Sequence, residues 1–334
     1  MPRGALGADM KRREFIRMVG AAAAALPMAV HAQQSAMAVV GVLSPEGPMT
    51  GNVNGLVQGL RELGYVDQRN IRFEYRWAEG RFDRLPELAA DLVRLRVDII
   101  VAFVTQAAEV AKKQTGTIPI VMVGVSDPVG AGLAASLAHP GGNVTGTSSL
   151  AAALVGKQLE LLKLVVPNNT RVAAVFNPAN VNFQALQVKE AKAASQTLGL
   201  QLRFFEVRAP SEFEAAFATV VQEQIAAVLI LIDPLFISNS KALAELSVKS
   251  RLITMTGYRT FAEAGALMSY GPNYFDSYKA AAPYVDKILK GDKPSDLPID
   301  QSSRFEFVVN LKTAKMFGIE IPASVLGFAG EVIE

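Results

Sequence analysis

The stretch Thr117–Leu150 reads TIPIVMVGVSDPVGAGLAASLAHPGGNVTGTSSL, and the rest of the chain is organised around it. Residues 118–123 form an apolar run broken only by Pro119, which is typical of a strand buried on both faces. The run stops at Ser126-Asp127-Pro128, where polar groups would emerge from a sheet. Residues 141–147 are small and predict a pliable crossover to further strands and helices. We therefore expect two lobes joined at this point.

Strand and helix patterns alternate on both sides of the crossover. Apolar strands are expected at 39–43 and 99–104 before it, and at 172–176 and 226–232 after it, with helical stripes between them. Such alternation predicts parallel sheets covered by helices on both faces. The fold class expected is α/β, with two doubly wound parallel-sheet lobes.

Four apolar strands, the run at 118–123 among them, end in a polar residue followed by proline. The pairs are Ser44-Pro45, Asp127-Pro128, Asn177-Pro178 and Asp233-Pro234. Proline ends the ladder, so each polar side chain is expected at a strand's carboxyl end, where open α/β sheets bind ligands. The alternative is that these residues are ordinary helix N-caps. Two pairs in each half of the chain favour a shared cleft.

The composition excludes several kinds of site. With 33 basic and 31 acidic residues, the chain lacks the cationic excess expected of a nucleic-acid-binding protein. It has no cysteine and only two histidines, so thiolate chemistry is impossible and a histidine-rich metal site is unexpected. Neither a Gly-x-Gly-x-x-Gly nor a Walker-type loop is present. We expect no cofactor, no bound metal and no enzymatic activity, because no nucleophile lies beside a base.

Residues 1–32 read as an export signal. Lys11–Arg17 is basic, Met18–Met28 is apolar and too short to span a bilayer about 30 Å thick, and cleavage is expected after Ala32. Arg12-Arg13 resembles a twin-arginine signal, but Lys11 stands where Ser or Thr is usual, so general secretion remains open. A cytosolic basic helix is the alternative. We expect a free, monomeric protein in the periplasm.

Several segments resemble a known family. They are GLRELGY (59–65), YRWAEG (75–80), DPVG (127–130), GGNVTG (141–146) and the leader's end at Ala32-Gln33-Gln34. They are similar to ABC-transporter substrate-binding proteins of the tryptophan/tyrosine type. The resemblance implies a type I periplasmic-binding fold with three crossovers, one small-molecule solute between the lobes, and transient docking on an ABC permease. The lobes are expected at 37–146 with 270–300, and at 147–269 with 301–334.

An amino-acid-like ligand needs donors for its carboxylate and an acceptor for its ammonium group. Ser44 and Thr105 are candidate donors near helix N-termini, and Asp127 and Asp233 are candidate acceptors. Asn177 offers both functions. The expected ligand is a small uncharged or zwitterionic carboxylate, first an aromatic or branched amino acid and second an aromatic acid.

Aromatic residues near strand ends complete the expected site. Trp77, Tyr258 and Tyr270 would hold an apolar part of the ligand, with Glu79 beside Trp77. Edge-strand packing is an equal alternative for Trp77, and Asp127 could act only as a cap. Arg259 could bind a ligand carboxylate, although pairing with Glu263 one turn on is favoured. The alternative functions are a sensor that docks on a membrane receptor and, less favoured, a periplasmic enzyme.

Overall fold

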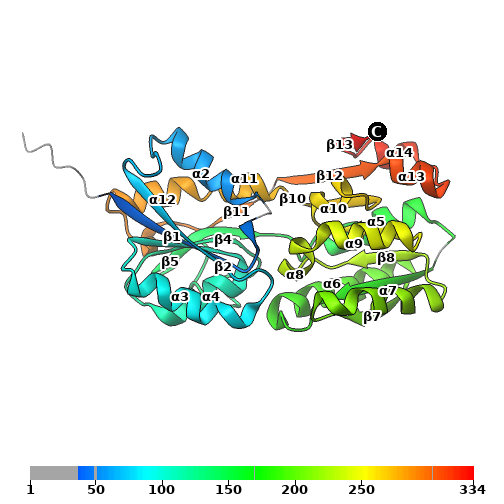
Figure 1. The fold of residues 1–334 in the computed structure, drawn as a ribbon, viewed down its shortest axis with the longest axis horizontal. Coiled ribbons are helices and arrows are strands. Elements are labelled where there is room, and N and C mark those ends of the chain that lie inside the picture. The colour runs from blue at the N-terminus through cyan, green and yellow to red at the C-terminus, as the bar shows by residue number, and fades with distance from the viewer. Residues whose placement is uncertain (1–36, 49–50, 169, 303) are drawn as a thin grey trace, which may run out of the picture. The chain divides into compact units, whose positions relative to one another are not determined.

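The computed structural model describes residues 37–48, 51–168, 170–302 and 304–334, and the expected export signal lies outside them. Residues 37–334 form one compact unit. Its strands form two sheets, and helices pack against each of them (Figure 1). The expected α/β class with two doubly wound lobes is confirmed.

The first sheet is parallel throughout its described pairs. Its strands, in spatial order, are β11 (Asp300–Ser302), β5 (Val144–Ser149), β4 (Ile120–Val125), β3 (Ile99–Phe103), β1 (Ala38–Ser44) and β2 (Ile71–Trp77). Its helices are α2 (Val53–Glu62), α3 (Leu85–Arg94), α4 (Val104–Gln114), α11 (Tyr274–Lys279) and α12 (Ala282–Leu289).

The two faces of this sheet have separate cores. Val40 and Val42 of β1 share one core with Leu56 of α2, whereas Leu43 belongs to another core with Leu92 of α3. Neighbouring residues of a strand point to opposite faces, so β1 is buried on both sides. This explains why its sequence is apolar at nearly every position rather than alternating.

The second sheet is not wholly parallel. Its order is β13 (Glu331–Ile333), β12 (Phe305–Asn310), β10 (Met268–Pro272), β9 (Ile253–Thr256), β8 (Ala227–Ile230), β6 (Arg171–Phe176) and β7 (Gln201–Glu206). Strand β12 runs antiparallel to β10, which corrects the expectation of a purely parallel sheet. The antiparallel direction of β12 follows from the way the chain reaches it. The chain passes from β11 directly into β12, and no crossover helix lies between them to reverse its direction.

Helices cover both faces of the second sheet. They are α5 (Val155–Val165), α6 (Val181–Leu198), α7 (Phe213–Gln222), α8 (Pro234–Ser238), α9 (Ser240–Lys249), α10 (Arg259–Glu263), α13 (Leu311–Phe317) and α14 (Ala323–Leu326). Phe217 of α7 packs in one core with Val228 of β8, and Leu159 of α5 packs in another core with Leu229 of the same strand. Strand β8 is therefore buried on both faces, as its sequence predicts.

The segment expected to be a pliable crossover is partly a strand. Residues 144–149 form β5 between β4 and β11, and Thr145 donates a hydrogen bond to the Leu297 carbonyl (2.6 Å). Gly146 has φ 128°, and a Cβ there would lie 2.1 Å from the Met122 carbonyl oxygen. The small residues thus permit close strand packing rather than flexibility.

The chain crosses between the sheets three times in its described part. The crossings follow β5, β10 and β11, a few residues beyond the expected limits at 146, 270 and 300. Strands β5 and β11 are neighbours, with Ser302 in register with Ser149. Two of the three connections therefore leave the first sheet side by side.

Candidate functional site

The carboxyl ends of strands from both sheets enclose a small cavity of about 20 Å³. Val104, Thr105 and Gln106, at the start of α4, line it on the side of the first sheet. Ile232 and Pro234, which follow β8, line it on the side of the second sheet. The full lining is Val104, Thr105, Gln106, Gly124, Ala151, Phe183, Ile232, Pro234, Ile237 and Tyr274. Both halves of the chain therefore contribute to one enclosed space.

The backbone at the start of α4 is strained at this cavity. Val104 has φ 59°, which is unfavourable for a β-branched side chain. The next residue, Thr105, is buried and lines both the cavity and a neighbouring groove of about 250 Å³. Such outliers concentrate at functional sites, where the surrounding structure holds them.

Side-chain hydrogen bonds join the two halves around the cavity. Asn52, just before α2, donates to the hydroxyl of Tyr258, which follows β9. Gln106 of α4 donates to the side-chain oxygen of Asn180. Further out, Asn182 of α6 donates to Glu109 of α4 (3.1 Å). These bonds hold the two sheet edges together.

A buried carboxylate lies beside the first of these bonds. Glu46, two residues after β1, is 1% exposed and accepts a hydrogen bond from Asn52 Nδ2 (3.3 Å). Asn52 therefore contacts both Glu46 and Tyr258. The ring of Tyr258 lies 4.9 Å from that of Tyr274, and both rings are buried. On α11, Tyr278 stacks on Phe103 at the end of β3, with ring centroids 4.0 Å apart.

These tyrosines are held neutral. Burial and then the charge of Glu46 raise the pKa values of Tyr258, Tyr274 and Tyr278 above the usual value for tyrosine. Glu46, Tyr274 and Tyr278 were absent from the expected site. Glu46 comes directly after Ser44-Pro45, and the two tyrosines share one face of α11, so the sequence did contain a signal for them.

Asp233 is at a strand end as expected and caps α8 through the Leu235 N–H (2.9 Å). Its carboxylate also accepts from Asn177 (3.0 Å), Asn180 (2.9 Å) and Gln184 (3.4 Å). Burial raises the pKa of Asp233 to about 6, although these hydrogen bonds oppose the rise. Both oxygens are thus already engaged, and Asn177 is held by the same network.

Three further expected residues stand at the carboxyl edge of the first sheet, and Glu79 follows β2. Ser44 is buried and accepts a hydrogen bond from the Glu46 N–H (3.1 Å). Asp127 accepts from the Gly130 N–H (2.8 Å) and lines the groove beside Thr105. Glu79 pairs with Arg84 (3.2 Å). Ser44, Thr105 and Asp127 thus all stand at the carboxyl edge of the first sheet.

The expected aromatic residues are distributed differently. Trp77 ends β2 and stacks on Tyr75, with ring centroids 5.6 Å apart. Tyr258 lines a groove of about 770 Å³ together with Glu79 and Pro48. Tyr270 lies inside β10 rather than after a strand, because that strand runs to Pro272 instead of ending at 269.

The ring of Tyr270 packs against Phe305 and Phe307 of β12, away from the residues that line the small cavity. Arg259 bonds Glu263 (2.8 Å), as the sequence favoured, and also Glu306 (3.1 Å) and Glu331 (2.8 Å). Burial raises the pKa of Glu306. Arg259 thus ties α10 to β12 and β13.

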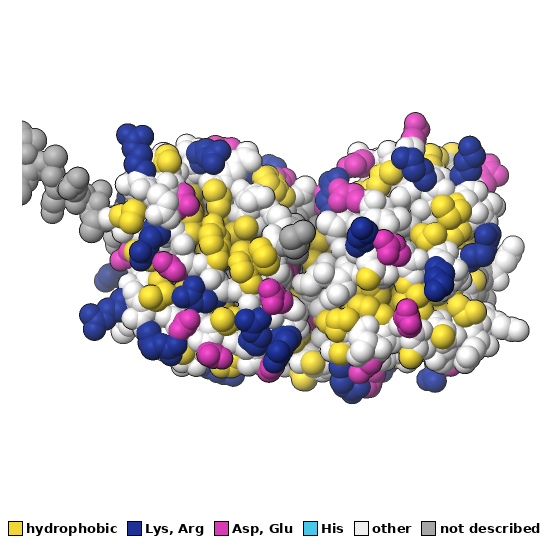
Figure 2. All heavy atoms as spheres, in the orientation of Figure 1, with side chains coloured by type: hydrophobic (Ala, Val, Ile, Leu, Met, Phe, Trp, Pro, Cys, Tyr) yellow, Lys and Arg dark blue, Asp and Glu magenta, His cyan; other side chains and the backbone are white. Residues whose placement is uncertain are grey.

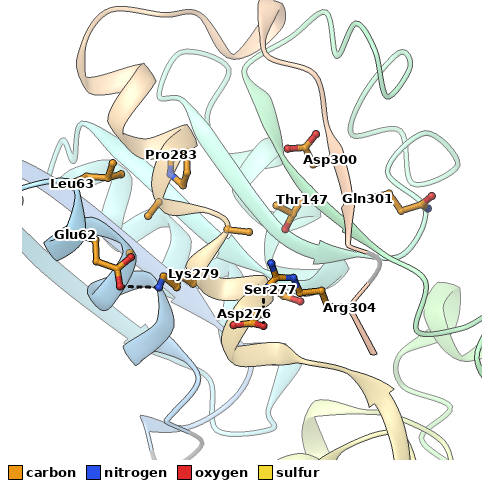
Figure 3. A pocket seen from close by; sticks show the side chains of 13 residues that line it. Glu62, Leu63, Thr147, Asp276, Ser277, Lys279, Pro283, Asp300, Gln301 and Arg304 are labelled. Carbon is orange, nitrogen blue, oxygen red and sulfur yellow. Dashed lines mark hydrogen bonds and ion pairs between the residues drawn. The ribbon is translucent and has the colours of Figure 1, made fainter. Parts of the chain in front are cut away.

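A further groove, of about 540 Å³, lies where α2 and α11 meet the ends of β5 and β11 (Figure 3). Its ion pairs are Lys279 with Glu62 (2.7 Å) and Arg304 with Asp276 (3.2 Å). Charges of both signs are also interspersed over the face drawn in Figure 2. Among the described residues, no His, Cys, Asp or Glu cluster is arranged to hold a metal ion, and no helix has the length and apolar character to cross a membrane.

The profile of the family described as "ABC transporter substrate binding protein" matches residues 36–333. The chain belongs to this family. Its members are substrate-binding proteins and act outside the cytoplasm. The expected family and the type I periplasmic-binding fold are therefore confirmed.

Individual relatives agree with this assignment. A "Tyrosine-binding protein" from Clostridioides difficile is 27% identical over 266 residues, or 80% of this chain and 76% of the relative. A Streptococcus pneumonia ABC domain in complex with L-Trp is 31% identical, with TM-score 0.81, covering 89% of this chain and 99% of that one. A ligand-free, open substrate-binding protein from Clostridium difficile is 27% identical over the same shares, with TM-score 0.63.

Proposed function

We propose that this protein binds a small carboxylate-bearing solute, first an aromatic or branched amino acid, between its two lobes and delivers it to an ABC importer. The observation that carries the proposal is the enclosed cavity built from strand ends of both sheets. Relatives named for tyrosine and bound to L-Trp support an aromatic amino acid as the first candidate. Branched amino acids follow, and aromatic acids are the second class.

Binding requires the lobes to separate and close again. A cavity of about 20 Å³ holds little more than one water molecule, whereas ligand pockets measure about 300–1,000 Å³. The ligand must therefore enter a more open arrangement. The TM-scores of 0.81 to the L-Trp complex and 0.63 to the open relative support the view that the present arrangement is the closed one. Closure on a ligand is one of the common switching motions.

Thr105 is the first candidate for the ligand's carboxylate. It stands in the first turn of α4, where backbone N–H groups and the helix dipole favour an anion. It is buried, and it lines the cavity from the first lobe. Ser44, Asp127, Asn177 and Asp233 are assigned to shaping the strand ends, because their side chains already bond neighbouring groups.

We further propose export by residues 1–32, a monomeric periplasmic protein, and transient docking on a membrane permease. The basic, apolar and small-residue order of the leader supports export. Its Arg12-Arg13 pair leaves the route open between twin-arginine export and general secretion. Replacing the pair with two lysines would abolish export by that route and leave general secretion working.

A thermal-shift screen of the purified mature protein tests the ligand class. Amino acids, aromatic acids, sugars and polyamines are compared at equal concentration. A ligand that binds only the folded state raises the melting temperature, and the rise grows with concentration. We expect aromatic or branched amino acids to stabilise the protein most. Stabilisation by a sugar or a polyamine alone would refute the proposal.

A further inference from the structure

We propose that Glu46 receives the ammonium group of the ligand, in an enclosure formed with Tyr258, Tyr274 and Tyr278. The protein would therefore select zwitterionic amino acids over the same molecules without the amino group. This inference rests on the proposed function and deepens it, because it separates the two ligand classes left open above.

The geometry places the carboxylate among aromatic rings drawn from both halves of the chain. Asn52 Nδ2 donates to both Glu46 and the hydroxyl of Tyr258, so these two groups lie close together around one amide nitrogen. Tyr258 packs on Tyr274, which also lines the small cavity. The enclosure thus adjoins the space assigned to the ligand.

The chemistry of the enclosure suits a cation. Aromatic faces attract an ammonium group, and the attraction is stronger when that group is desolvated. The charges that raise the pKa values of Tyr258 and Tyr274 include Glu46 and Glu306, both negative, after burial as the main cause. A negative potential between low-dielectric walls favours a positive group. The neutral hydroxyls can also accept hydrogen bonds from it.

Access to Glu46 depends on the separation of the lobes. Glu46 is buried in the present arrangement, and Asn52, which donates to Glu46, also donates to Tyr258 of the second half of the chain. Breaking that bond would withdraw Tyr258 and leave Glu46 facing the opened cleft. On closure, Tyr258 would return as the wall contributed by the second lobe, so the ammonium group would contact both lobes together.

Calorimetric titration with matched ligand pairs tests the inference. The pairs are L-tyrosine with 3-(4-hydroxyphenyl)propionate, L-tryptophan with 3-(indol-3-yl)propionate, and L-leucine with 4-methylpentanoate. Each pair differs only in the amino group. Removing one partner of a buried charge pair costs about 2–5 kcal/mol, so wild-type protein should prefer the bound amino acid by about 30-fold or more.

The variant Glu46→Gln keeps the shape of the side chain and its bond from Asn52 but removes the charge. We expect it to lose the preference within a pair while still binding the deaminated partner. The matched control is Glu87→Gln, a change of the same kind at an exposed position of α3. It should keep the wild-type preference.

The outcomes separate the two proposals. If wild-type protein binds both members of a pair equally well, the amino-acid-type ligand stands but the role of Glu46 is refuted, whether or not the variant folds. A preference that survives in Glu46→Gln also refutes it. If wild-type protein binds no member of any pair, the proposed ligand class fails, and the inference fails with it.

Discussion

Asn52 and Tyr258 lie 206 positions apart in the chain, yet the side-chain amide of the first donates a hydrogen bond to the phenol of the second. Asn52 precedes α2 of the first lobe, and Tyr258 follows β9 of the second. With Gln106 and Asn180, they form a contact between the two lobes. We expect this contact to oppose the opening that the proposed function requires.

Removing both amides should favour the open arrangement. Each hydrogen bond contributes about 1 kcal/mol net, so the double variant Asn52→Ala/Gln106→Ala should shift the equilibrium about 30-fold. Small-angle scattering of the ligand-free variant should give a larger radius of gyration than wild type. The control Gln58→Ala removes an amide that bonds within α2, and should scatter like wild type. A ligand-free double variant with the radius of gyration of wild type would contradict the role of these two bonds in holding the lobes together.

Thr105→Val tests the carboxylate contact. Valine keeps the shape of threonine but loses the hydroxyl donor. A hydrogen bond to a charged group contributes about 1.5–3 kcal/mol, so affinity for a bound amino acid should fall about 10- to 150-fold. Thr219→Val is the matched control, because that hydroxyl bonds Ala215 on the far helix α7. Unchanged affinity in Thr105→Val would exclude the hydroxyl from the ligand contact.

Asp233 should make stability depend on pH in an unusual direction. Burial raises its pKa to about 6 in the folded state, whereas an unfolded aspartate has a pKa of about 3.9. The folded state therefore binds the proton more tightly, and this residue's contribution to the unfolding free energy falls as pH rises from about 4 to about 6. Above that range its contribution is constant.

Urea unfolding of wild type and Asp233→Asn at several pH values checks this. The free energy of unfolding of wild type minus that of the variant should fall by about 2–3 kcal/mol between pH 4 and pH 7, and then level off. A difference that rises with pH would mean that the hydrogen bonds from Asn177 and Asn180 outweigh burial. Asp233→Ala should be less stable than Asp233→Asn, because it leaves those buried amides without their acceptor.

Gly146→Ala should destabilise the fold. The new Cβ would lie 2.1 Å from the Met122 carbonyl oxygen, at a φ of 128° that disfavours any side chain. We expect the free energy of unfolding to fall by at least about 1 kcal/mol from backbone strain, and by more because of the clash. The control Gly142→Ala has open space around its Cβ and should change stability far less. Equal effects of the two changes would contradict the close packing of β4 and β5.

The sequence predicted the architecture where local pattern and burial agree. Strands such as β1, β3 and β8 are apolar at nearly every position because both faces are covered. It failed at β5, whose glycine, threonine and serine residues read as a loop. Only the neighbouring β4 and β11 provide the hydrogen bonds that make this segment a strand.

The site was only partly predictable. The strand-end pattern located Ser44, Thr105 and Asp233 at the correct sheet edges. It could not reveal that the carboxylate of Asp233 already accepts hydrogen bonds from Asn177 and Asn180, because those bonds depend on β6 and β8 being neighbours. It also missed Glu46 and Tyr274, whose proximity arises only when the chain returns to the first lobe after β10.

Ser149 is in register with Ser302, so two of the three connections leave the first sheet as neighbours. Sliding one of these strand ends past the other would break the backbone hydrogen bonds that pair β5 with β11. We therefore expect the proposed opening of the lobes to take place beyond Ser149 and Ser302, with the two connections bending together and the pairing of β5 with β11 unchanged.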